Sequence, residues 1–250
     1  LRAAGYRSLV RPKLSKLAPN VIIDDDEGEA GNPFLKPYRA WNADLSAEYY
    51  FGRNAAVSAG FFWKDIKDYI VDVTEFDTSY NGIDLDELTT AINGESAEIK
   101  GFEFSYSQQM SFLPAPFDGL LAQFNYTYTD AKGTLVSYDD DDQPYLRTIG
   151  LPASSKHTFN AVLGYEKGPV SLRVAGTYRD KYLDEAGGAA NEDRIVADQF
   201  KLDLSAKFRI TPGVRIFAEW VNVTDAPYFA YQQFEGRRRL LQYEDYSWTA

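Results

Sequence analysis

The feature that most constrains this sequence is a strict alternation of apolar and polar residues, repeated along almost the whole chain. Between Leu120 and Thr129, for example, Leu, Ala, Phe and Tyr residues alternate with mostly polar ones. Because successive side chains of a β-strand point to opposite faces, this period of two predicts strands with one apolar and one polar face. We predict about ten such strands, at residues 1–11, 40–51, 54–72, 97–113, 119–132, 154–167, 170–183, 197–210, 213–226 and 239–250.

The predicted strands are joined by two kinds of connection that alternate along the chain. Short turns containing Gly or Pro are predicted at residues 51–54, 113–119, 166–169 and 210–213. Long polar loops are predicted at residues 12–39, 73–96, 133–153, 184–196 and 227–238. In an antiparallel meander, this alternation places the short turns at one end of the strands and the long loops at the other.

The predicted strands are long, and their apolar faces are rich in aromatic residues. Most exceed the usual strand length of about five or six residues and reach the roughly nine to eleven that cross a bilayer at a tilt. Aromatic residues make up 15% of the chain and are frequent toward strand ends, as at Trp41, Tyr49, Trp63 and Tyr165. A soluble β-sandwich would alternate in the same way, but with Val, Ile and Leu on its inner faces. Aromatic residues near both ends of the strands favour a transmembrane β-barrel, because such residues are enriched at both membrane–water interfaces.

The composition excludes several other classes of protein. A net charge of -11 argues against a nucleic-acid partner, because phosphate binding requires a basic face. No apolar stretch approaches the roughly 18 residues of a membrane-spanning helix. The chain has no Cys, and its single histidine, His157, belongs to no nucleophile motif or metal-ligand spacing. We therefore predict that the protein is not an enzyme, that it holds no catalytic residue, metal or cofactor, and that His157 is a structural interface residue.

Several local blocks are more specific than the alternation. They lie at residues 31–37 (GNPFLKP), 42–51 (NADLSAEYYF), 62–70 (FWKDIKDYI), 99–103 (IKGFE), 125–130 (NYTYTD), 155–160 (SKHTFN) and 222–225 (NVTD). In this order they resemble blocks of the TonB-dependent receptors, the active transporters of Gram-negative outer membranes. The resemblance covers nearly the full 250 residues. No block among these residues resembles the plug domain or the TonB box of that family.

The resemblance implies an all-β fold. Residues 1–250 would form the C-terminal part of an antiparallel transmembrane barrel of 22 strands, with its closing strand cut at residue 250. The long loops would be extracellular and the short turns periplasmic. The implied function is TonB-coupled uptake of a scarce nutrient, with carbohydrate or oligosaccharide favoured over a ferric siderophore. A passive porin-like channel or a surface receptor is the alternative. The implied partners are outer-membrane lipid and lipopolysaccharide, the protein's own N-terminal plug domain, TonB and a small nutrient ligand, with no nucleic acid and no cofactor.

Two sets of residues are candidates for contact with the nutrient or its path. Aromatic and amide side chains of the long loops suit a sugar-like ligand, or are simply loop residues that meet water; they are Tyr80, Asn81, Tyr138, Tyr145, Tyr228, Phe229, Tyr231 and Gln232. Charged residues predicted to face the lumen would line the path or pair across neighbouring strands; they are Lys100, Glu103, Arg173, Arg179, Lys201, Asp203, Arg215 and Glu219.

Two acidic runs lie in the predicted long loops, and a basic run lies at the outer end of the last predicted strand. The acidic runs at residues 24–27 and 139–142 offer carboxylates to Ca²⁺, but they lack EF-hand spacing, and solvated loop charge is the interpretation we favour. The basic run at residues 237–239 is compatible with lipopolysaccharide phosphates and equally with an ion network that includes Glu235 and Glu244.

Overall fold

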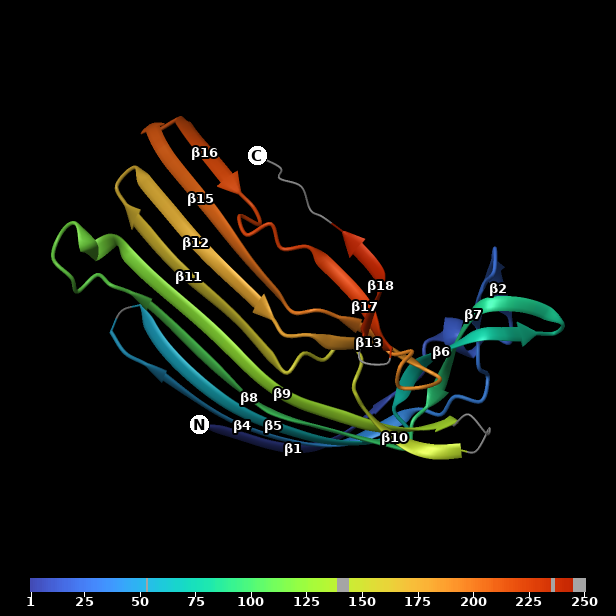
Figure 1. Cartoon of the computed structure of the whole chain (residues 1–250). Coiled ribbons are helices and arrows are strands. Elements are labelled where there is room, and N and C mark those ends of the chain that lie inside the picture. Colours follow the sequence, from blue (N-terminus) through green and yellow to red (C-terminus); the bar gives the residue numbers. More distant parts are fainter. Residues whose placement is uncertain (53, 139–143, 235–236, 245–250) are drawn as a thin grey trace.

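The computed structural model describes residues 1–52, 54–138, 144–234 and 237–244 of the chain, and its regular structure is almost entirely β (Figure 1). One sheet contains ten strands; in spatial order they are β1 (Arg2–Val10), β4 (Tyr38–Tyr50), β5 (Ala55–Lys67), β8 (Ser96–Gln109), β9 (Leu120–Tyr138), β11 (His157–Lys167), β12 (Val170–Arg179), β15 (Gln199–Thr211) and β16 (Val214–Trp220), with β10 (Pro144–Gly150) paired to β9. Every pairing in this main sheet is antiparallel, as the alternation predicted.

The predicted short turns all lie at one end of the main sheet (Figure 1). Tyr50 pairs with Ala56 across the first turn, and Lys167 pairs with Val170 across the third. The connection between β8 and β9 contains a short 3-10 helix, Phe117–Gly119. This part of the predicted topology is confirmed.

The predicted long loops contain regular structure. Together with parts of neighbouring predicted strands, they form a four-residue helix, α1 (Leu14–Leu17), and a second sheet of eight strands. In spatial order these strands are β18 (Arg237–Glu244), β17 (Tyr228–Phe234), β14 (Arg194–Val196), β13 (Tyr182–Gly187), β6 (Ile70–Tyr80), β7 (Ile83–Asn93), β3 (Glu27–Ala30) and β2 (Val21–Asp24). Two of its pairings, β13 with β6 and β3 with β7, are parallel.

Several predicted boundaries change for local reasons. The strand predicted at 54–72 ends at Lys67, because Asp68 adopts a positive φ of 57° and turns the chain into β6. The strand predicted at 213–226 ends at Trp220, shortly before Asn222 with φ 54°. The chain segment predicted at 170–183 divides into β12 and β13, which belong to different sheets.

The last predicted strand also lies elsewhere than expected. β18 pairs with β17 in the second sheet and not with the main sheet, and residues 245–250 lie outside the described part of the chain. The prediction that residues 1–250 form one piece of a barrel remains a prediction.

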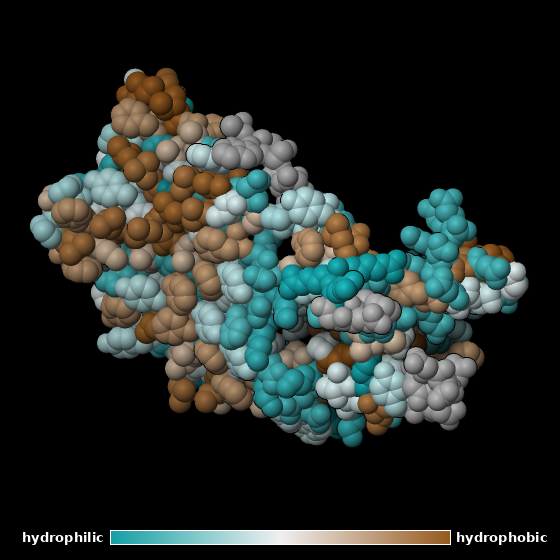
Figure 2. Space-filling view, in the orientation of Figure 1, coloured by the Kyte–Doolittle hydropathy of each residue, from teal (hydrophilic) through white to brown (hydrophobic). Residues whose placement is uncertain are grey.

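The two faces of the main sheet differ as predicted. One face, here called the apolar face, presents exposed aromatic and aliphatic side chains; examples are Trp41, Leu45, Phe61, Phe102, Phe104, Phe124, Leu163, Leu172, Val174 and Phe208. Rings on neighbouring strands contact one another from β8 to β12, and Phe159 of β11 also contacts Phe200 of β15, with centroid distances of 5.2–6.4 Å. Apolar colour gathers over the main sheet and polar colour over the second sheet in Figure 2. The face opposite, here the polar face, has hydrogen bonds such as Ser105 to Asn125 at 2.8 Å.

The buried core lies where the second sheet meets the long-loop end of the main sheet. Its buried members are Ala40, Ile66, Tyr69, Val71, Ala97, Leu135, Ile149, Leu183 and Ala186. The Tyr69 ring lies against Gly94 and Gly133, where a Cβ would come within 2.1 and 2.6 Å of it. These glycines are therefore required by the close approach of the ring.

Both edges of the main sheet, β1 and β16, have a strand on one side only among the described residues. No helix in the described part of the chain is long and apolar enough to cross a membrane.

Candidate functional site: the rim at the long-loop end

The second sheet and β10 together form a layer at the long-loop end of the main sheet, which we call the rim. Its strands carry many more acidic than basic residues. Its basic residues Arg147 and Arg194 are nevertheless each paired with a carboxylate, as buried charges must be.

Arg147 of β10 is the centre of the most buried ionic group in the rim. Its side chain is 8% exposed, and its Nη1 donates to both carboxylate oxygens of Asp193, at 2.9 and 2.8 Å. Its Nε donates to the Ser137 hydroxyl at 3.1 Å, and its Nη2 donates to the Gly187 carbonyl at 2.8 Å. The Gly187 N–H donates in turn to Asp193 at 3.0 Å. This group ties β9, β10, β13 and the segment before β14 together.

Burial dominates the electrostatics of this group. It raises the pKa of Asp193 above the usual value of an aspartate, although the hydrogen bond and charge of Arg147 act in the opposite direction. Burial also raises the pKa of Tyr69 to about 12. Among the side chains that the structure describes, the Tyr69 hydroxyl is a buried polar group without a hydrogen-bond partner.

A second ionic group surrounds Arg194 of β14. Its Nε donates to Asp184 at 3.0 Å, and hydrogen bonds to Asp184 and Tyr228 raise its pKa despite partial burial. Burial raises the pKa of the neighbouring Glu185 carboxyl, against the lowering effect of the Arg194 charge. The rim is therefore held together by cations placed among acids.

The structure does not bring the predicted ligand-binding residues into one cluster. Tyr80 and Asn81 lie at the tip of the β6–β7 hairpin, which projects from the rim at the right of Figure 1. Tyr145 is 40% exposed in β10. Tyr138 pairs through its backbone with Pro144, and its side chain lies outside the described part.

The four candidates in β17 are more enclosed. Tyr231 and Gln232 are buried, and the Gln232 amide donates to the Glu192 carbonyl at 3.0 Å. Tyr228 and Phe229 are half-buried. All eight residues stay predictions as ligand contacts.

Most of the charged residues predicted to face the lumen lie on the polar face. The strand register shows this, because residues paired across neighbouring strands share a face; the residues are Glu103, Arg173, Arg179, Lys201, Asp203, Arg215 and Glu219. Several pair locally. Arg173 binds Glu166 at 2.6 Å, Arg179 donates to Ser155 at 2.8 Å, and Asp203 accepts from the Asn222 N–H at 2.7 Å. Their lumenal role stays a prediction.

Lys100 does not belong to this set. It shares the apolar face with Phe102, because both have even positions in β8, and it pairs there with Glu98 at 2.6 Å. The sequence prediction for Lys100 was therefore wrong.

The charged runs have separate environments. Residues 24–27 form the β2–β3 turn, where the Asp26 carbonyl accepts from the Asp86 N–H at 2.8 Å. No group of three potential metal ligands is found among the described residues, and the run at 139–142 lies outside them, as does Glu235. The Arg238 guanidinium carbon lies 4.5 Å from the centre of the Tyr231 ring. Burial raises the pKa of the Glu87 carboxyl, and the charge of Arg239 acts in the opposite direction. Both interpretations of the basic run stay open.

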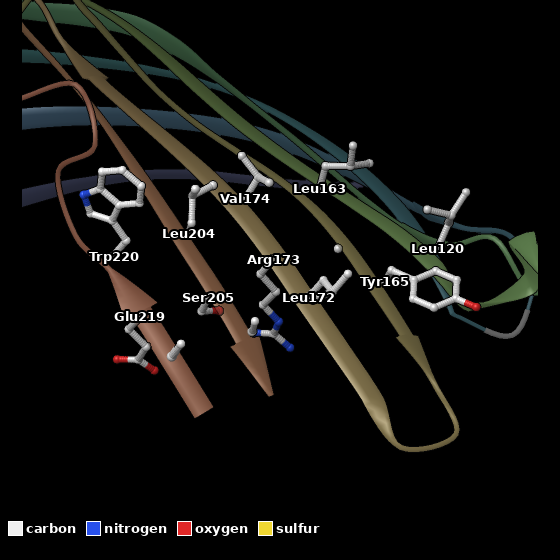
Figure 3. A pocket seen from close by; sticks show the side chains of 13 residues that line it. Leu120, Leu163, Tyr165, Leu172, Arg173, Val174, Leu204, Ser205, Glu219 and Trp220 are labelled. Atoms are coloured by element: carbon white, nitrogen blue, oxygen red, sulfur yellow. The ribbon is translucent and has the colours of Figure 1, made fainter. Parts of the chain in front are cut away.

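A depression of the surface lined mostly by apolar side chains lies on the apolar face, away from the rim. Figure 3 shows Leu163, Val174 and Leu204 gathered on one side of β11, β12 and β15, with Arg173 directed away from them. Such a surface suits hydrocarbon chains and not a polar nutrient. A wholly antiparallel sheet with this face, tight turns at one end and long connections at the other defines the wall of a transmembrane β-barrel.

Comparison with known proteins gives the family. The model of the TonB dependent receptor-like β-barrel matches residues 1–223. The chain belongs to this family, whose members are transporters rather than enzymes and are integral to the outer membrane.

Individual relatives agree with this assignment. The chain is 29% identical over 244 residues to the iron-regulated outer membrane virulence protein of Vibrio cholerae, covering 95% of this chain and 35% of that relative. The ferric enterobactin receptor of Pseudomonas aeruginosa has a similar fold, with a TM-score of 0.58 at 17% identity, covering 96% of this chain and 34% of that one. The copper transporter OprC has a TM-score of 0.62 at 19% identity, covering 91% and 31%. The chain thus spans about a third of the length of the proteins it matches.

The sequence prediction missed the Arg147 group because it assigned residues 133–153 to a loop. A signal was present on both sides of the acidic run. Residues 133–138 and 144–150 contain β-branched and aromatic residues and flank a polar segment, which is typical of a hairpin.

Proposed function

We propose that the protein containing this chain carries out TonB-coupled uptake across the outer membrane, and that its substrate is a chelated metal ion. The observation that carries the proposal is the 29% identity, over 95% of the chain, to an iron-regulated outer membrane protein. A protein whose production responds to iron is expected to act in iron supply. This relationship weighs against the carbohydrate substrate favoured by the sequence.

The charge of the rim further limits which kind of metal chelate the protein would accept. Acidic side chains outnumber basic ones there, and the cations Arg147 and Arg194 are already engaged with Asp193 and Asp184. Because a field of one sign repels ligands of the same sign, the rim favours a neutral or cationic chelate over a trianionic one. A ferric tris-hydroxamate fits this requirement better than a ferric tris-catecholate.

The decisive experiment measures uptake in cells with the intact full-length gene, with the gene deleted, and with the gene restored. The probes are a radiolabelled ferric tris-hydroxamate, a ferric tris-catecholate and a labelled oligosaccharide. We expect gene-dependent uptake of the hydroxamate complex, abolished by a protonophore or by loss of TonB.

Each alternative has its own outcome. Gene-dependent uptake of the oligosaccharide alone would overturn the metal proposal in favour of the sequence expectation. Uptake that survives loss of TonB would indicate the passive channel. Preference for the catecholate complex would refute the charge argument while leaving metal uptake in place.

A further inference from the structure

Two Asn-Gly pairs occur in the chain, at residues 81–82 and 93–94, and the structure places them in opposite surroundings. This dipeptide is chemically labile because the backbone nitrogen of the second residue can attack the side-chain carbonyl carbon of the asparagine, and glycine offers that nitrogen without steric hindrance. The reaction requires a free amide side chain and a peptide that can rotate toward it. The two pairs can therefore be compared by the hydrogen bonds that hold these groups.

The first pair forms the exposed tip of the β6–β7 hairpin, which projects from the rim (Figure 1). Asn81 and Gly82 have φ values of 51° and 82°, as in the two-residue hairpin turns that favour this dipeptide. A Cβ at Gly82 would meet nothing within 4 Å. Among the described residues, the Asn81 side chain makes no hydrogen bond and the Gly82 N–H makes no turn or loop hydrogen bond. Both reacting groups of this pair are therefore free to move.

The second pair lies at the end of β7 and is held at every group that the reaction uses. The Asn93 amide nitrogen donates to the Lys36 and Asp68 carbonyls at 3.0 and 2.8 Å, and its amide oxygen accepts from the Lys36 N–H at 2.8 Å. The Gly94 N–H donates to the Tyr69 carbonyl at 2.8 Å, and Gly94 is buried. These four hydrogen bonds must open before the Gly94 nitrogen can reach the Asn93 side chain.

We propose that Asn81–Gly82 is a site of self-modification, at which the hairpin tip loses its amide and gains a carboxylate. The Gly82 nitrogen gives its proton to solvent and forms a bond to the Asn81 Cγ, and the side-chain nitrogen takes up a proton and leaves as ammonia. A five-membered succinimide ring remains. Water then adds to one of the two ring carbonyls and opens the ring to aspartate or isoaspartate. The net reaction consumes one water molecule and releases one ammonia.

Either product changes the tip of the hairpin. Both add a negative charge to strands that already carry several acidic residues. In isoaspartate the main chain runs through the former side chain, so the turn between Tyr80 and Ile83 gains a backbone atom. Older protein molecules would therefore present a different hairpin from newly made ones. The modification does not depend on which nutrient the protein transports.

The test incubates the folded full-length protein in detergent and mildly alkaline water enriched in a heavy oxygen isotope, and then digests it with trypsin in ordinary water. Only carboxylates formed during the incubation carry the isotope at residue 81 or 93. Both pairs lie in one tryptic peptide, residues 68–100, so fragmentation of this peptide in a mass spectrometer compares them directly. Label should appear at residue 81 at least about 100-fold faster than at residue 93, because the hydrogen bonds of the second pair must first open.

The same protein unfolded in denaturant is the matched control. Unfolding removes the hydrogen bonds of both pairs, so label should then appear at residues 81 and 93 at similar rates. The variant Asn81→Gln should lose the label at residue 81 and keep the slow rate at residue 93, because the longer glutamine side chain would have to close a larger ring.

Three results would overturn the proposal. Equal rates at the two residues in the folded protein would show that the hairpin tip is protected. The same preference for residue 81 in the unfolded protein would show that neighbouring residues, and not the fold, decide the rate. A carboxylate at residue 81 without heavy oxygen would show that it forms only during digestion. Nutrient uptake is a separate readout, so failure of this proposal leaves the proposed transport function untouched.

Discussion

Replacement of Arg147 by methionine tests whether the rim is held to the main sheet by one buried ionic group. The change keeps the unbranched stem of the side chain but removes the guanidinium, and it leaves the Asp193 carboxylate, whose side chain is 17% exposed, without its cation. Breaking a buried pair on one side costs about 3–5 kcal/mol. Ser137 and the Gly187 carbonyl also lose a donor.

The measurement is amide hydrogen exchange of the full-length protein, read over residues 183–196. A local loss of about 3 kcal/mol corresponds to exchange faster by roughly 100-fold. Arg179→Met is the matched control, because Arg179 also makes two hydrogen bonds, to Ser155 and Ala153, but has no carboxylate partner among the ion pairs of the described residues. It should cost about 1 kcal/mol.

The effect of pH on Arg147→Met has a definite sign. Burial already raises the pKa of Asp193, and removal of Arg147 takes away the interactions that lower it. A carboxyl whose folded-state pKa is raised contributes stability that is present below its unfolded pKa and lost as pH rises through the folded one. The defect should therefore shrink as pH falls toward 4. Equal exchange in the two arginine variants, or a double variant with Asp193→Asn that shows no recovery, would refute the reasoning.

Three further changes test the core and one turn. Gly133→Ala places a Cβ 2.6 Å from the Tyr69 ring and should destabilise the protein by about 1–3 kcal/mol in thermal unfolding, whereas Gly150→Ala, with open space around it, should be nearly neutral; similar losses would contradict this. Tyr69→Phe removes a buried hydroxyl that has no partner among the described residues and should leave stability equal or higher by about 1 kcal/mol, so a clear loss would reveal a partner. Asn222→Ala removes a side-chain acceptor for the Ala226 N–H at 3.1 Å and strains a residue with φ 54°, so exchange at residues 221–227 should rise, and more than in Asn222→Gly.

The main sheet could be predicted from the sequence because its two faces have different surroundings, which impose the alternation of apolar and polar residues. The segment from Ala122 to Thr129 alternates without interruption, since one face meets hydrocarbon and the other meets polar surroundings. The strand partners then follow from chain order and turn length. The strand ends could not be predicted in this way. They depend on the backbone conformation of single residues, such as the positive φ of Asp68, for which the sequence offers no periodic signal.

The rim could not be predicted in the same way, because its contacts join segments that are far apart in sequence. Arg147 and Asp193 are 46 residues apart, and nothing near either residue specifies the other. The parallel pairing of β13 with β6 joins Ala186 to Val73, which no meander rule predicts. Burial of Tyr231 in a strand expected to be a loop has the same origin.

The two single-sided strands β1 and β16 have a consequence for any laboratory work on these 250 residues taken alone. Each presents a row of backbone groups to which another chain can add, and the sheet between them is long and apolar on one side. Separated from the rest of its wall, the polypeptide would behave as a template for strand exchange and fibre growth. Self-association, and not transport or ligand affinity, would then be what such a preparation reports.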